Sequence, residues 1–274
     1  MEPAIIAVFL FVLGAVVGSF LNVCIDRIPK GESIFFPPSH CDSCGRRLAP
    51  LDLVPALTYL WQRGKCRYCH ADVHWRMPVV ELATGILFAG IGHMVGWGLQ
   101  LAPALFYASL FLVVLVTDLE RQMIPNRLVL PALPLAWLLS VLWPLPEAAR
   151  GVLVLLPAPL MSGGVTPVLV QSLAGGLIAF LVMLIPWLLF PGGLGAGDVK
   201  LAALVGLATG FPLALLALLI SFLGGGVVGG ALLLTGVKGR KEPIPFGPFL
   251  AIAAMVVFLW GDALARWYWH SLSF

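Results

Sequence analysis

The stretch AIIAVFLFVLGAVVGSFLNVC, residues 4–24, contains no charged side chain. A helix of about 20 apolar residues is long enough to cross the hydrocarbon core of a bilayer. The preceding Met1-Glu2-Pro3 lacks the basic start of a secretory signal, and no small-residue cleavage site follows the run. We therefore expect residues 4–24 to form a retained transmembrane helix.

The composition extends this interpretation to the whole chain. Of the 274 residues, 60% are hydrophobic and only 11% are charged, whereas soluble domains carry about 25% charged residues. The net charge of +3 is too small and too dispersed to suggest nucleic acid as a partner. These values predict an all-α polytopic membrane protein whose main partner is the lipid bilayer.

Apolar runs of similar length recur along the chain and predict about eight transmembrane helices. The expected spans are 4–24, 79–98, 101–117, 128–145, 169–190, 199–210, 213–235 and 248–269. The sixth is short for a full crossing. Residues 199–235 therefore form either one full span or two.

The basic residues are distributed unevenly between the connections. If residues 25–78 face the cytoplasm, the alternation places 118–127, 191–198 and 236–247 there too. These segments, with the adjoining helix ends, hold fourteen of the sixteen basic residues: Arg27, Lys30, Arg46, Arg47, Arg63, Lys65, Arg67, Arg76, Arg121, Arg127, Lys200, Lys238, Arg240 and Lys241. The other side holds Arg150 and Arg266. Because basic loops stay inside, both termini are expected to face outward, with the connection 146–168 exported.

This topology divides the chain into three parts. Residues 1–24 form the first transmembrane helix, 25–78 a cytoplasmic loop domain, and 79–274 the transmembrane core. The loop domain is the one sizeable polar segment, and it contains four of the five cysteines. Cys41 and Cys44 form one CxxC pair. Cys66 and Cys69 form the second, with 21 residues between the two pairs.

Two CxxC pairs are typical of a zinc site, because each pair presents two thiolates to one tetrahedral ion. A cytoplasmic loop is reducing, which disfavours disulfides. Four unrelated buried thiols are the simpler alternative, and His40, His70 and His74 are nearby substitute ligands. The complete sulfur set favours a structural zinc that folds the loop. Cys24, at the end of the first helix, is expected to be a packing residue.

Asp198 follows a glycine-rich break after a long apolar run, and a carboxylate near lipid is a functional hypothesis by default. Asp118 ends the third expected helix at a similar depth on the same side. Two adjacent carboxylates repel, so one keeps a proton while the other stays ionised. Such a pair can direct the attack of water on an amide. The alternative is that both are helix-end residues wetted by the interface, with Asp198 an N-cap. Spacing alone leaves both interpretations open.

The glycines before Asp198 are expected to support the catalytic loop. Gly192, Gly193, Gly195 and Gly197 let backbone approach backbone and supply positive φ where needed. We expect Gly195 and Gly197 to matter most, because they are nearest to the carboxylate.

GAGD, residues 195–198, matches the GxGD signature of intramembrane aspartyl proteases. Nearly the whole chain, from residue 18 to about residue 254, resembles the bacterial type IV prepilin leader peptidases. The matching motifs, in order around the cysteine pairs, are GSFLNVCIDRIP (18–29), RMPVVELATG (76–85), DLERQMIPNRLVLP (118–131), GLGAGDVKLAALVG (193–206) and PIPFGPFLAIAA (243–254). A departure is Ala196, where many relatives have a larger residue.

The resemblance implies a bifunctional enzyme of the bacterial inner membrane, with Asp118 and Asp198 as the catalytic pair and zinc on the four cysteines. It implies removal of a basic leader from prepilins and pseudopilins at the cytoplasmic face. It also implies N-methylation of the new terminus from S-adenosyl-L-methionine, by residues that the sequence does not identify. Pilus or secretion machinery are possible partners.

Two other classes of protein share some of these features. A transporter also uses broken helices with acids near them, but it predicts a repeated pattern in the two halves, and the cysteine loop has no counterpart. A non-catalytic membrane scaffold, with the zinc knuckles as a docking module for a secretion machine, is the main alternative. A scaffold would tolerate loss of Asp118 and Asp198.

Overall fold

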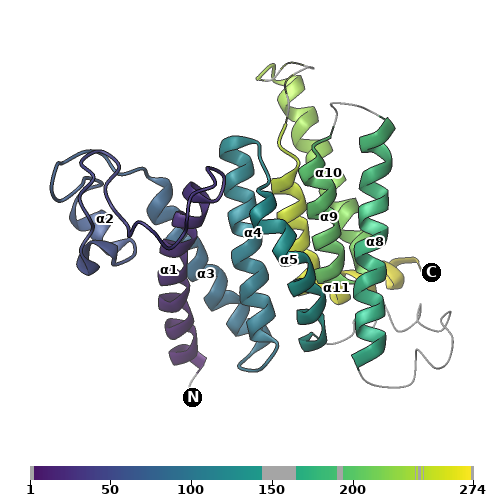
Figure 1. Ribbon diagram of the computed structural model, residues 1–274. Coiled ribbons are helices and arrows are strands. Elements are labelled where there is room, and N and C mark those ends of the chain that lie inside the picture. Colours follow the sequence, from purple (N-terminus) through teal and green to yellow (C-terminus); the bar gives the residue numbers. More distant parts are fainter. Residues whose placement is uncertain are drawn as a thin grey trace. The chain divides into compact units, whose positions relative to one another are not determined.

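The computed structural model describes residues 3–143, 165–189, 194–237, 239, 242 and 244–272, and its regular elements there are helices (Figure 1). In chain order these are α1 Pro3–Arg27, η1 Pro50–Leu53, α2 Leu57–Trp61, α3 Arg76–Val95, α4 Leu101–Arg121, α5 Asn126–Leu139, η2 Ser140–Leu142, α8 Val165–Leu189, α9 Ala196–Thr209, α10 Leu213–Leu234 and α11 Gly247–Leu272. Strand-like pairing is limited in this part of the chain to two isolated bridges in the cysteine loop.

Helix forms in each of the eight expected spans, but the count of eight crossings is not confirmed. Six of the described helices are long and apolar enough to cross a membrane: α1, α3, α4, α8, α10 and α11. The other two, α5 and α9, have 14 residues each. Residues 199–235 thus contain one helix of spanning length, α10, preceded by a shorter one. The exported connection expected at 146–168 lies mostly outside the described residues.

The chain divides into two compact units, and the division falls within α4. In the first, Met1–Val113, α1 packs closely on α3. A Cβ added at Gly14 would lie 2.6 Å from the carbonyl oxygen of Thr84, and one added at Gly18 would lie 2.7 Å from the Cα of Glu81. Small residues in this pattern let two membrane helices approach backbone to backbone.

Polar contacts fix the two helices at the end where the loop begins. Arg76, the first residue of α3, forms an ion pair with Asp26 of α1 at 2.7 Å. The Asn22 side chain donates to the carbonyl of Met77 at 3.0 Å. We call residues 28–75, which connect α1 to α3, the knuckle region. Figure 1 shows this region at the C-terminal end of α1.

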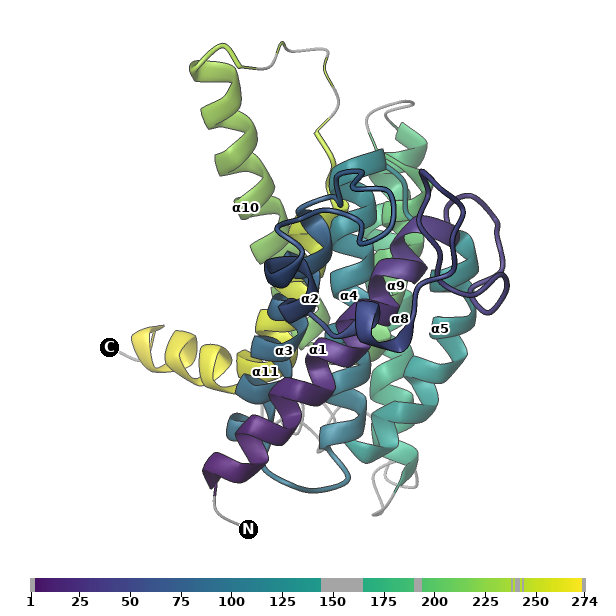
Figure 2. The same cartoon turned by 90° about the vertical axis from the view of Figure 1, so that its left-hand side faces the viewer.

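The second unit, Val114–Phe274, is built around α9. This helix packs against α5, α8, α10 and α11. Ten of its fourteen residues are buried, as expected for a largely apolar helix that is enclosed by other helices. Residues Leu201, Ala202, Leu204 and Val205 are completely buried. Figure 2 shows α10 and the C-terminal part of α11 diverging from one another beyond this core.

The contact between α8 and α9 depends on glycine. A Cβ at Gly175 of α8 would lie 2.5 Å from the carbonyl oxygen of Gly206 of α9. The Ser172 hydroxyl donates to the carbonyl of Leu207 at 2.7 Å. At its end α9 is stopped by Gly210, whose φ is +71°. Because α9 is short and buried, its N-terminus and Asp198 lie inside the second unit.

Candidate active site and metal centre

Asp118 lies in the last turn of α4 and is 5% exposed. Its Oδ2 accepts a hydrogen bond of 3.0 Å from the N–H of Gly247, the first residue of α11. The first amides of a helix have no partner within the helix and carry partial positive charge. The N-terminus of α11 therefore holds the carboxylate of Asp118.

Asp198 lies in the first turn of α9 and is 8% exposed. Its Oδ2 accepts a hydrogen bond of 3.2 Å from the N–H of Gly195, the N-cap residue. Asp198 is thus the third residue of α9 rather than the N-cap itself, and its side chain bonds back to the N-cap residue. This contact uses only Oδ2. Oδ1 is buried and has no hydrogen-bond partner among the described residues.

A buried acceptor without a partner is costly and requires an explanation. The two carboxylates are close enough for the charge of Asp118 to act on Asp198. Ile124, which follows α4, packs against the first turns of both α9 and α11. A Cβ at Gly197 would lie 2.9 Å from the Cβ of Ile124, and one at Gly247 would lie 3.2 Å from its Cδ1. The site therefore contains two converging acids and an oxygen able to accept a proton.

The expectation of positive φ before Asp198 is wrong for both described glycines. Gly195 has a φ of −77°, and neither it nor Gly197 has a positive φ. Space is the reason for glycine here: a Cβ at Gly195 would lie 2.9 Å from Asp198 Oδ2. The sequence indicated where glycine is needed but not why. Gly192 and Gly193 lie outside the described residues.

Lys200, two residues after Asp198, points to a different partner. Its Nζ donates to Oδ1 of Asn126 at 2.9 Å, which links α9 to the first residue of α5. The lysine therefore fixes a neighbouring helix end.

The knuckle region contains two turns of the same design. The N–H of Gly45 donates to the carbonyl of Cys41 at 2.8 Å, and the N–H of His70 donates to the carbonyl of Cys66 at 3.0 Å. Gly45 and His70 both have left-handed backbone, with φ of +68° and +58°. Each occupies the position directly after the second cysteine of its pair.

The two turns bring the four cysteine sulfurs together. The Sγ atoms of Cys41, Cys44, Cys66 and Cys69 all lie within 4.8 Å of one another, and those of Cys41 and Cys69 are 3.8 Å apart. Four sulfurs bound tetrahedrally at about 2.3 Å from one zinc ion lie about 3.8 Å apart. The thiol set therefore fits a four-coordinate metal ion.

Two of the neighbouring histidines, His40 and His74, make other contacts. The Nδ1 of His40 contacts the carbonyl of Pro38 at 3.0 Å, and the Nδ1 of His74 accepts the N–H of Arg76 at 3.1 Å. Within the described residues, the sulfur cluster is the one group of three or more potential ligands that could hold a metal. Cys24 lies apart from it, buried in α1.

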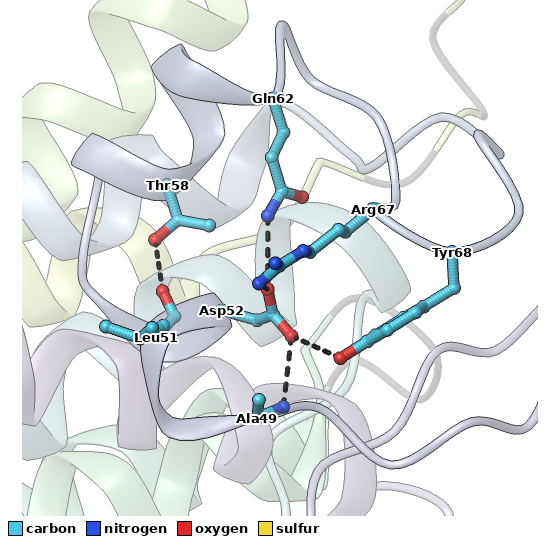
Figure 3. A network of polar contacts seen from close by, with 7 residues as sticks. All are labelled: Ala49, Leu51, Asp52, Thr58, Gln62, Arg67 and Tyr68. Carbon is cyan, nitrogen blue, oxygen red and sulfur yellow. Dashed lines mark hydrogen bonds and ion pairs between the residues drawn. The ribbon is translucent and has the colours of Figure 1, made fainter.

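Asp52, which none of the sequence motifs above singles out, joins the segment after the first knuckle to the second knuckle (Figure 3). Its Oδ2 accepts the N–H of Ala49 and the hydroxyl of Tyr68, both at 3.0 Å, and its Oδ1 accepts the Gln62 amide at 3.2 Å. The Arg67 guanidinium lies 3.8 Å from Oδ1. A proline followed two residues later by an acid, as in Pro50-Leu51-Asp52, is the helix-start pattern that could have identified it.

These donors determine the charge state of Asp52. Burial alone would raise the pKa of this carboxyl, but the hydrogen bonds from Ala49, Tyr68 and Gln62 and the charge of Arg67 outweigh it. The pKa of Asp52 is therefore lower than its ordinary value. Asp52 is a fixed anion with both oxygens occupied, and it holds the knuckle region together.

The comparison with known proteins agrees with this arrangement. Residues 12–95 match the Bacterial Peptidase A24 N-terminal domain, and residues 104–230 match the Type IV leader peptidase family. A "Prepilin leader peptidase/N-methyltransferase" of Bacillus subtilis (strain 168) is 34% identical over 94% of this chain and 96% of the relative. The chain belongs to the type IV leader peptidase family.

Other relatives carry the same name. That of Aeromonas hydrophila is 33% identical over 95% of this chain and 92% of its own, and that of Pseudomonas aeruginosa is 29% identical over the whole of this chain and 97% of its own. No solved structure matches the chain significantly. The segment that matches the leader peptidase family contains both Asp118 and Asp198. With six candidate spans, this family member is a multi-pass membrane protein.

Proposed function

We propose that this protein cleaves the basic leader from type IV prepilins and pseudopilins with Asp118 and Asp198, and N-methylates the new terminus. The observation that carries the peptidase proposal is the pair of buried, interacting acids, one of which has an oxygen without a partner among the described residues. The relatives' name supports both activities.

The proposed cleavage divides the roles between the two acids. The ionised carboxylate takes a proton from water as the water oxygen attacks the scissile carbonyl carbon. The protonated carboxyl gives its proton to the carbonyl oxygen, which yields a tetrahedral gem-diol. Collapse of that intermediate breaks the C–N bond: the leaving amine takes a proton from one carboxyl, and a diol hydroxyl gives its proton to the other carboxylate. The free Oδ1 of Asp198 supports its contact with the water.

We further propose that the site and the knuckle region face the cytoplasm in the inner membrane, with both termini outside. The distribution of basic residues supports this topology. Alkaline phosphatase is active only after export, so a fusion after residue 272 should be active and one within the knuckle region inactive. The reverse pattern would contradict the topology.

Zinc is the metal that the four thiolates support best, and we propose a structural role for it. A closed shell of four protein ligands leaves no position for a reacting water. The ion would fold the knuckle region, which is too small to hold a core of its own. Metal analysis of the purified protein should give about one zinc per chain. Its absence, or disulfides between these cysteines, would remove the proposal.

The decisive experiment replaces each acid by its amide. Asn preserves size and hydrogen bonding but cannot carry the proton, so Asp118→Asn and Asp198→Asn should accumulate uncleaved prepilin at normal membrane abundance. The matched control is Glu120→Gln, which changes an exposed acid two residues from Asp118 and should leave cleavage intact. Substantial cleavage by either Asn variant would contradict the two-acid mechanism and favour a non-catalytic scaffold. Reagents against serine and cysteine proteases should have no effect.

A further inference from the structure

The first unit contains a cavity of about 650 Å³ between the C-terminal half of α1 and residues 34–53 of the knuckle region. This volume is within the range of small-molecule sites, about 300–1,000 Å³. One wall is formed by Val16, Phe20, Val23 and Arg27, which are spaced by three or four residues and therefore share one face of α1. Neither the four cysteines nor the proposed catalytic acids line the cavity, so the roles described above leave it unassigned.

The wall on α1 continues an exposed apolar stripe. Ile5, Val8, Val12, Val16 and Phe20 recur every three or four residues along α1, and each is between 45% and 64% exposed. In a bilayer, a side chain of a spanning helix that does not pack on protein contacts the acyl chains of lipids instead. Because α1 is a candidate span, a surface that faces lipid leads directly into the cavity.

Arg27 lies where this stripe ends, at the depth of the lipid headgroups. At a rise of about 1.5 Å per residue, the 25 residues of α1 extend over about 37 Å, which exceeds the hydrocarbon thickness of about 30 Å. Arg27 is the last of these residues and is about 10 Å beyond Phe20 along the axis. Its Nη1 donates to the carbonyls of Ser33 at 3.1 Å and Pro37 at 2.6 Å. These neutral partners fix the guanidinium without compensating its charge.

A second guanidinium lines the cavity from the knuckle region. Arg47 is exposed, and its side chain forms no ion pair or hydrogen bond with the residues that the structure describes. The cavity lining in that part of the chain consists of eleven apolar residues, two serines and the two arginines, without an acid. A positively charged cavity attracts anions, and arginine binds phosphate through pairs of parallel hydrogen bonds. The cavity thus combines donors for a phosphate with an apolar wall.

We propose that this cavity binds one anionic phospholipid of the surrounding bilayer. Arg27 and Arg47 bind its phosphate, and its acyl chains lie along the exposed face of α1. Basic pockets at the ends of membrane helices are suited to acidic headgroups. A soluble phosphate would leave the apolar wall unused, and a basic leader peptide would be repelled by two guanidiniums. The lipid connects α1 to residues 34–53 and holds this part of the knuckle region at the bilayer surface. The proposal does not rest on either enzymatic activity.

The test measures which lipid the cavity takes up. Purified full-length protein in mixed micelles receives a sub-saturating amount of a photoactivatable phosphatidylglycerol, or of a phosphatidylcholine with the same reactive acyl chains. Cross-linked peptides are identified by mass spectrometry. In the wild type, peptides from residues 16–27 and 34–53 should be labelled more strongly by phosphatidylglycerol. Helix α8 has no basic residue and reports the general lipid shell, so both lipids should label it equally.

Variants assign the preference to the arginines. One basic residue near an acidic headgroup contributes about fivefold to binding, so Arg47→Gln should reduce labelling of these peptides by phosphatidylglycerol about fivefold, and Arg27→Gln/Arg47→Gln about 25-fold. The matched control, Arg63→Gln, removes an exposed charge of the same region that does not line the cavity and should match wild type. Arg47→Gln decides the test, because its side chain has no polar contact with the described residues to lose, and its metal content should equal that of wild type.

Four results would overturn the proposal. Equal labelling of residues 16–27 and 34–53 by the two lipids would show that the cavity does not recognise charge. Equal labelling of Arg47→Gln and wild type would remove the guanidinium pair, and loss of metal from Arg47→Gln would make Arg47 a structural residue. Unlabelled phosphatidylglycerol should compete with the label, whereas inorganic phosphate should not. Equal competition by inorganic phosphate would make the cavity a site for soluble anions instead.

Discussion

Substituting Gly247 by alanine perturbs the proposed peptidase site by a single methyl group. The added Cβ would lie 2.6 Å from Asp118 Oδ2 and 3.0 Å from its Cγ. Ordinary contact begins at 3.4 Å, so the carboxylate oxygen must move by about 0.8 Å. The same oxygen accepts the N–H of Gly247 at 3.0 Å, so the movement also strains the hydrogen bond that fixes it.

The expected loss follows from this displacement. Moving a reacting group by about 1 Å costs about 100-fold in rate, which corresponds to about 2.7 kcal/mol of transition-state stabilisation. Gly247→Ala should therefore lower kcat for prepilin cleavage about 100-fold and change KM little, because the substituted position touches the acid. The helix itself should tolerate alanine, since glycine is the poorer helix former by about 1 kcal/mol.

The assay measures cleavage rates of a prepilin by purified protein at several substrate concentrations, alongside membrane abundance. The matched control is Gly226→Ala in α10, where an added Cβ meets nothing within 4 Å. This variant should cleave at the wild-type rate. If Gly247→Ala cleaved within threefold of wild type, the contact with Gly247 would not position Asp118, and the reasoning would be refuted. Equal losses in both variants would attribute the effect to general damage to the unit.

Three further predictions follow from the same contacts. Gly197→Val should abolish cleavage because its Cβ would lie 2.9 Å from that of Ile124, and adding Ile124→Ala should restore part of the rate in the same gel assay. Failure of that rescue would contradict a steric cause. Cys66→Ser should lower bound metal by elemental analysis and reduce methyl transfer more than cleavage; a larger loss of cleavage would assign the metal to the peptidase. Asp52→Asn should speed metal release to a chelator by a similar factor at pH 6 and pH 8. The pKa of Asp52 is lower in the folded protein than its unfolded value of about 3.9. Its stabilising effect is therefore complete at any pH above about 3.9 and is lost only as the pH falls through the lower folded pKa. A difference in metal release that appeared only at pH 8 would contradict this assignment.

The positions of the helices could be predicted from the sequence, but their depth of burial could not. Runs of apolar residues such as 4–24 and 213–235 coincide with helices of spanning length. The run 199–210 has a similar composition, yet it forms the buried α9. Hydropathy measures transfer out of water and gives the same signal for a helix covered by lipid and one covered by other helices. Gly175 and Gly206, where α8 and α9 meet, show that α9 is covered by protein.

The candidate sites show the same limit at the level of single residues. The CxxC spacing was sufficient to bring four sulfurs together, because each pair is a local turn. Asp118 and Asp198 could be singled out as candidates because an acid in an apolar setting is conspicuous. Glu81 has the same signal, but its place near the start of a helix offered a simpler explanation. Its partner is Ala56, 25 residues away, and contacts of that separation cannot be inferred from one sequence.

The two kinds of acid in this protein can be distinguished by what their second oxygen does. One oxygen of Asp52 and one of Asp198 accepts a backbone N–H three residues earlier in the chain, from Ala49 and Gly195 respectively. In Asp52 the other oxygen accepts Gln62 and faces Arg67, so no proton or water has a place there. In Asp198 the other oxygen is buried with no partner among the described residues, and a folded protein retains such a cost only where something else compensates for it. The same local motif thus supports structure when it is saturated and is available for chemistry when it is not. Replacing Asp52 by Asn should therefore affect how firmly the knuckle region holds its metal, whereas replacing Asp198 by Asn should affect the cleavage rate.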